Sequence, residues 1–92
     1  MTPAERRDKA LALVRDRRAA YIEVFGSEVG SAAVVRADLE QFCRMKESTF
    51  HPDARVHALM EGRREYALRV QDHLTLTDEE LLMRYGGEKL IS

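Results

Sequence analysis

The sequence predicts an all-α protein, a small bundle of three long helices plus one short C-terminal helix. Three observations support this prediction. Apolar residues recur at steps of three and four positions in three segments, threonine precedes glutamate by three positions at two helix starts, and no segment reads convincingly as a strand. The 92 residues contain no internal repeat and are expected to form a single helical domain, 1–92.

The first predicted helix begins with the sequence TPAE, in which Thr2 and Glu5 can form a capping box around a proline at the first helical position. Its apolar stripe runs to Phe25, and Gly26 is a suitable C-terminal stop. This segment predicts a helix of more than twenty residues.

The second predicted helix follows a cap at Ser27, and its apolar stripe ends at Phe42 and Cys43. The segment 48–53 then breaks the pattern. The residue before a proline is pushed out of the helical region, and Asp53 can cap the helix that follows. We therefore expect a short loop between two antiparallel helices.

The third predicted helix covers residues 54–74 and contains Gly62, which is costly inside a helix and is expected to permit a close helix crossing. A second capping box begins at Thr77 and opens the short fourth helix, which is expected to end at Gly86 and Gly87. The predicted core draws on the three long helices: Val14, Ile22, Phe25, Val35, Leu39, Phe42, Leu59, Val70 and Leu74.

Two charged residues fall on these apolar stripes, Asp38 in the second helix and Arg63 in the third. A buried charge without a partner would cost several kcal/mol. We therefore expect Asp38 and Arg63 to form a structural ion pair, with Glu61 or Arg64 as a third member. A catalytic role for the pair is the less favoured interpretation.

The residue types of a metal or catalytic site occur, but their pattern does not favour one. Cys43, His51, His57 and Glu61 are zinc-ligand types, yet their spacing matches no known finger or ribbon. No glycine-rich turn near Cys43 could supply an oxyanion hole, and phosphate-binding loops and serine elbows are absent from the sequence. The sequence thus predicts no catalytic, cofactor-binding or metal residues, no cofactor and no enzymatic activity.

Charge restricts the class of partner. Fifteen basic and sixteen acidic side chains give a net charge of −1, so no global field draws the protein to nucleic acid or to an anionic membrane. The first predicted helix carries six basic against four acidic residues, a local net charge of +2. Mixed charges on a solvated helix are the commoner explanation, so contact with nucleic acid is an alternative that is not favoured. The candidate partner or nucleic-acid contacts are Arg6, Arg7, Arg15, Arg17, Arg18 and Arg64.

A single cysteine forms no internal disulfide, and the N-terminal segment carries charges where a signal peptide needs an apolar core. The longest apolar run, SAAVV, is far shorter than the roughly 20 residues that span a bilayer. We expect a protein made in a reducing, cytoplasmic compartment, with no membrane segment.

Four motifs occur in order within about sixty residues: Asp38-Leu39 with Phe42-Cys43, Ser48-Thr49-Phe50 with Pro52-Asp53, Glu61-Gly62-Arg63-Arg64, and His73-Leu74 with Leu76-Thr77. This ordered set resembles a family of small tailed-bacteriophage proteins, found with the head and tail morphogenesis genes of short-tailed phages of the Bordetella phage type. The chain departs from the family pattern at Asp53-Ala54, where the family often has Asp-Pro.

The resemblance implies a phage origin and a place in virion assembly, but no biochemical activity. We therefore expect a non-enzymatic virion-structural or assembly (morphogenesis) protein that acts through contacts with other phage proteins and is a candidate for incorporation in the virion. The alternatives are a nucleic-acid-binding accessory protein that uses the basic N-terminal helix, and a phage-encoded inhibitor of a host enzyme. The aromatic end of the first helix, from Tyr21 to Phe25, also predicts a homo-oligomer.

Overall fold

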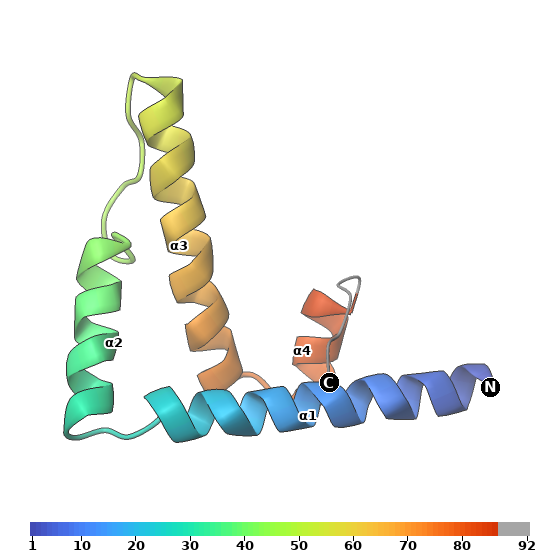
Figure 1. Cartoon of the computed structure of the whole chain (residues 1–92). Helices are drawn as coiled ribbons and strands as arrows, with labels where there is room; N and C mark the ends of the chain where they lie inside the picture. Colours follow the sequence, from blue (N-terminus) through green and yellow to red (C-terminus); the bar gives the residue numbers. More distant parts are fainter. Residues whose placement is uncertain (87–92) are drawn as a thin grey trace.

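The computed structural model describes residues 1–86, which contain four helices and no strand (Figure 1). They are α1 (Pro3–Phe25), α2 (Ser31–Phe42), α3 (Ala54–Thr75) and α4 (Asp78–Tyr85). Helix α1 runs along one side of the molecule, α2 and α3 stand side by side across it, and α4 returns to α1 (Figure 1). The all-α prediction is confirmed.

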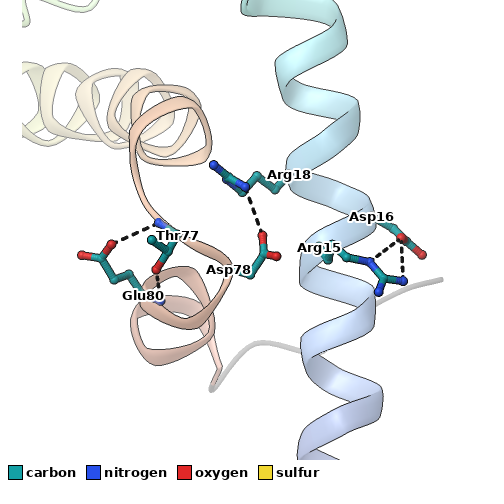
Figure 2. A network of polar contacts seen from close by, with 6 residues as sticks. All are labelled: Arg15, Asp16, Arg18, Thr77, Asp78 and Glu80. Atoms are coloured by element: carbon teal, nitrogen blue, oxygen red, sulfur yellow. Dashed lines mark hydrogen bonds and ion pairs between the residues drawn. The ribbon is translucent and has the colours of Figure 1, made fainter.

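Local capping explains where three of the helices start. The Thr2 hydroxyl accepts from the Glu5 amide at 3.1 Å, and the Asp53 carboxylate accepts from the Arg55 amide at 2.8 Å. At α4 the box is complete, because the Thr77 hydroxyl accepts from the Glu80 amide while the Thr77 amide donates to the Glu80 carboxylate (Figure 2). The start of α4 was predicted correctly, and its predicted end includes Gly87, which lies outside the described residues.

Helix α2 differs from its prediction, because it has only 12 residues and is not a third long helix. It starts after Gly30, whose positive φ of 74° suits glycine, and the predicted cap Ser27 lies earlier in the connecting turn. It ends at Phe42 because Arg44 adopts φ 53° and the Met45 amide donates to the Glu40 carbonyl at 2.9 Å. The expected short loop therefore spans all of residues 43–53.

The core is small and lies mainly where α3 and α4 meet α1. Val14 and Leu81 are fully buried, and Val70, Ala67 and Cys43 are nearly so. Of the predicted core, Val14 and Val70 are confirmed, while three further residues are only half-buried: Phe25, Leu39 and Leu74. Four predicted core residues are exposed instead: Ile22, Val35, Phe42 and Leu59. The prediction was wrong for these four because the short α2 packs over only part of α1 and α3, so the apolar stripes of all three helices remain partly uncovered.

Candidate functional site

The C-terminal end of α3 carries a histidine that is enclosed between α1 and α4. His73 is fully buried. Its ring stacks on Tyr21 of α1 at a centroid distance of 4.2 Å and on Tyr85 of α4 at 5.7 Å. The three stacked rings thus connect α1, α3 and α4.

Two hydrogen bonds determine the tautomer of His73. Its Nδ1 lies 2.7 Å from the Arg69 carbonyl oxygen, which can only accept, so Nδ1 carries the proton. Its Nε2 is then free to accept from Arg17 Nε at 3.0 Å. Burial is the largest effect on His73 and lowers its pKa below the ordinary value of 6.5. The hydrogen bond to the Arg69 carbonyl raises this pKa, and the charge on Arg17 lowers it. The imidazole is thus held in its neutral form.

Asp72 provides the charged end of the same cluster. Its Oδ2 accepts from the Tyr85 hydroxyl at 2.7 Å and from Arg84 Nη1 at 2.9 Å. Burial, together with the hydrogen bond to Asp72, raises the pKa of Tyr85 to about 12. The Arg69 guanidinium carbon lies 4.9 Å from the centre of the Tyr85 ring. We call Arg17, Tyr21, Asp72, His73 and Tyr85 the histidine cluster.

The chemistry of the histidine cluster favours a structural role. Both ring nitrogens of His73 are occupied within the molecule, so neither is available to take a proton from a substrate. Among residues 1–86, no group of three histidine, cysteine, aspartate or glutamate side chains could hold a metal ion. The cluster therefore acts as a joint between helices.

A second joint lies where the loop 43–53 meets the N-terminal half of α3. Thr49 is buried, and its hydroxyl donates to the Glu61 carboxylate. The Thr49 carbonyl oxygen lies 2.9 Å from His57 Nδ1, and His51 Nδ1 accepts from the Asp53 amide at 3.0 Å. Three of the four zinc-ligand residue types in the sequence, His51, His57 and Glu61, thus have partners that position the loop.

The predicted ion pair between Asp38 and Arg63 is not formed. Both residues are exposed, and no ion pair within residues 1–86 joins them. The Arg63 guanidinium carbon lies 4.5 Å from the centre of the Phe42 ring instead. The prediction was wrong because it assumed burial, and an exposed charge requires no protein partner.

Three of the six candidate contact arginines are engaged within the molecule. Arg17 donates to His73. Arg18 Nη1 lies 3.4 Å from Asp78 at the start of α4 (Figure 2). Arg64 Nη1 donates to the Glu47 carbonyl at 3.3 Å. These three side chains connect helices or hold the loop.

The other three candidates lie on the outside of α1. Arg6 and Arg7 are exposed in its first turns, and Arg15 is exposed beside Asp16 at 3.4 Å (Figure 2). The first nine residues of the chain are all exposed. Of the candidate arginines, α1 therefore presents Arg6, Arg7 and Arg15 to a partner.

A cavity of about 340 Å³ lies between the end of α1, α2 and α3. Its wall includes the apolar side chains of Leu39, Val70 and Leu74 together with Arg36. Arg36 Nη1 donates to the Phe25 carbonyl at 2.6 Å, which ties α2 to the end of α1. The cavity reflects the incomplete packing of α2.

Sequence patterns did not indicate that Asp72, His73 and Tyr85 belong to one cluster, nor that Arg84 pairs with Asp72. His73 and Asp72 are adjacent, so they project from different sides of α3, and neither belongs to the apolar stripe. Their partners lie in α1 and α4, up to 56 positions away. The closeness of His73 to the capping box at Thr77 was the available signal, since α4 must fold back near the end of α3.

In its described residues the protein is small and helical, and the histidine cluster and the polar contacts of the loop 43–53 join its elements. Within the described part of the chain, no helix has both the length and the apolar character needed to cross a membrane. The chain belongs to the family of Bbp19-like phage proteins, whose model matches residues 21–84. The phage family inferred from the sequence is thereby confirmed. No curated protein and no solved structure matches the chain.

Proposed function

We propose that the protein is a non-enzymatic component of phage morphogenesis, either a virion-structural or an assembly protein, that acts through contacts with other phage proteins. It would work in the host cytoplasm and could then be incorporated in the particle. The observation that carries this proposal is the exposure of large apolar side chains on a phage-family protein. Phe50, at the tip of the loop 43–53, is 75% exposed. Exposed aromatic side chains are typical anchors of protein interfaces.

Quantitative mass spectrometry of purified particles tests a structural role. Particles of the phage that encodes the protein should contain it at a fixed copy number through successive purification steps. Its loss during purification would leave only the assembly role. A tagged copy expressed during infection should then capture other phage proteins, and capture of no phage protein would contradict both roles.

The same capture experiment can locate the contact. Phe50→Ser should reduce the recovery of phage partners, because it removes an exposed aromatic side chain at the loop tip. Met83→Ser, at a side chain of α4 that is 87% exposed, is the matched control and should leave recovery unchanged. Recovery of a host enzyme in place of phage proteins would favour the inhibitor hypothesis.

A nucleic-acid-binding accessory role is the second candidate, and it is supported by the exposure of Arg6 and Arg7 at the free end of α1. Fluorescence anisotropy with labelled duplex DNA should then show binding that weakens steeply with salt. Replacing both arginines by alanine should weaken binding, whereas Arg44→Ala in the distant loop should not. Equal binding by all three proteins would contradict this use of α1.

A further inference from the structure

One side of the α2–α3 pair carries a row of residues from each helix. Val35, Asp38 and Phe42 recur at steps of three and four along α2, and Leu59, Arg63 and Tyr66 do so along α3. The Arg63 guanidinium carbon lies 4.5 Å from the centre of the Phe42 ring, which joins the two rows. We call these six residues the lateral face.

The lateral face is apolar and uncovered. Val35 is 46% exposed, Leu59 55% and Tyr66 50%, and Phe42 is likewise more than half exposed. Four large apolar side chains therefore meet solvent on neighbouring turns of two helices. A patch of this kind on a small protein marks an interaction surface.

The two charges of the lateral face have opposite signs and lie on different helices. Asp38 belongs to α2 and Arg63 to α3, both are exposed, and the described residues contain no ion pair between them. Arg63 rests its guanidinium on the Phe42 ring, so the N–H groups at the edge of the guanidinium can still bind a carboxylate. The face thus carries a donor and an acceptor of complementary charge on its two rows.

The area of the molecule is also consistent with a covering partner. The accessible surface is 6777 Å² for a chain of 10.6 kDa. A compact monomer of that mass exposes about 5,500 Å². The excess is larger than the roughly 800 Å² that each partner contributes to a standard interface.

We propose that the lateral face binds the same face of a second copy of this chain across a two-fold axis. In such an isologous interface, each residue pair occurs twice with the roles of the subunits exchanged. Asp38 of each chain then pairs with Arg63 of the partner subunit, and the apolar side chains of the two faces cover one another. A second copy satisfies both charges and the apolar patch at once.

The experiment begins with the mass of the full chain by light scattering across the micromolar range. The wild type should be a dimer, and a monomer at every concentration would overturn the proposal. Asp38→Arg and Arg63→Asp should each raise the dimer dissociation constant at least about ten-fold, because each places two like-charged pairs in the interface. Circular dichroism verifies that both variants remain helical.

Mixing the two charge-reversed variants is the decisive measurement. In the mixture one subunit supplies two arginines and the other two aspartates, so a heterodimer regains both opposite-charge pairs. Recovery of the dimer mass only on mixing is the expected result. If the variants stay apart on mixing, or remain dimers when separate, the assigned pairing is wrong.

Two further variants test whether the dimer uses the lateral face. Glu65→Arg reverses an exposed charge on α3 outside the lateral face and should leave the dimer intact. Tyr66→Ser changes no charge and should weaken the dimer, so it decides the matter if a charge reversal unfolds the chain. An unchanged dimer in Tyr66→Ser would place the interface elsewhere. The self-association does not rest on the proposed morphogenetic role, and either can fail without the other.

Discussion

At the scale of single residues, His73 is the clearest case of a polar group whose role depends on its surroundings. Its ring lies between Tyr21 and Tyr85, and its two nitrogens are hydrogen-bonded to Arg69 and Arg17. A proton on Nε2 would remove the acceptor for Arg17 and place two cations side by side. The folded state therefore favours the neutral imidazole.

This preference makes stability depend on pH in a defined direction. The pKa of His73 is lowered by burial from 6.5, so below that value the unfolded chain takes up a proton that the folded chain resists. The stabilising contribution of neutral His73 is complete above pH 6.5 and is lost as the pH falls toward the folded pKa. Thermal melts should show a Tm that falls as the pH is lowered below 6.5.

The variant His73→Gln provides the control. It should flatten the acidic limb of the Tm profile, although it also lowers Tm, because the cluster loses a stacked ring. An acidic limb as steep as that of the wild type would assign the pH dependence to carboxylates.

Tyr85 allows a second test at the same scale. Its hydroxyl donates to Asp72 at 2.7 Å, and Asp72 is largely buried. Tyr85→Phe should lower the free energy of unfolding by about 1–2 kcal/mol, as expected for a lost hydrogen bond to a charged group that keeps its contact with Arg84. Urea unfolding measures the change, and Tyr66→Phe, at a half-exposed ring, should be nearly neutral in the dissociated chain.

At the scale of helices, α4 is short and depends on two features, its capping box and its apolar anchor. Leu81 is fully buried, while Met83, two positions later, is almost fully exposed. A helix of 8 residues is not stable alone, so the packing of Leu81 holds it against α1.

Leu81→Ala should therefore destabilise the protein by about 2–5 kcal/mol, as expected for a leucine truncated in a closed core. Met83→Ala should change the free energy of unfolding by less than about 0.5 kcal/mol. Chemical denaturation of both variants measures the difference. Similar losses in the two would mean that α4 does not dock through Leu81.

The two threonine caps give a further comparison between elements. Thr77→Ala should cost about 1 kcal/mol, because it removes the acceptor for the Glu80 amide in a helix that must stay docked. Thr2→Ala removes the same kind of cap from the first turn of α1, where residues 1–9 are exposed. Fraying of that turn exposes little additional apolar surface, so the melting curve of Thr2→Ala should stay close to that of the wild type. A larger loss at Thr2 would show that the start of α1 is packed.

At the scale of the whole molecule, the chain is open. The radius of gyration is 15.6 Å, and the principal extents are 49 × 35 × 18 Å. A compact domain of this length would have a radius of about 12 Å. The difference arises because α2 and α3 meet α1 at one end each and project away from it (Figure 1).

Small-angle X-ray scattering of the dissociated chain, for example the Asp38→Arg variant, should therefore give a radius near 16 Å rather than near 12 Å. The open arrangement predicts this value because α2 and α3 each meet α1 at one end and project away from it (Figure 1). A radius near 12 Å would mean that the free chain closes, and that its apolar faces are covered internally.

Local sequence was sufficient for the helical class and for three helix starts. The caps at Thr2, Asp53 and Thr77 act over two or three positions, so they can be read before any fold is known. The break at residues 48–53 was also visible. The earlier end of α2 at Phe42 was not, because Arg44 ends the helix in a conformation for which glycine is the usual signal.

Burial and side-chain partners depended on tertiary structure. An apolar stripe shows which side of a helix can be buried, but the length and crossing of its neighbour decide whether it is. The short α2 left Asp38 and Arg63 exposed and unpaired with each other, against the prediction from their stripes. The return of α4 onto α1 enclosed His73, which no stripe had indicated. Caps depend on neighbours in the chain, whereas desolvation depends on every element that packs around a group.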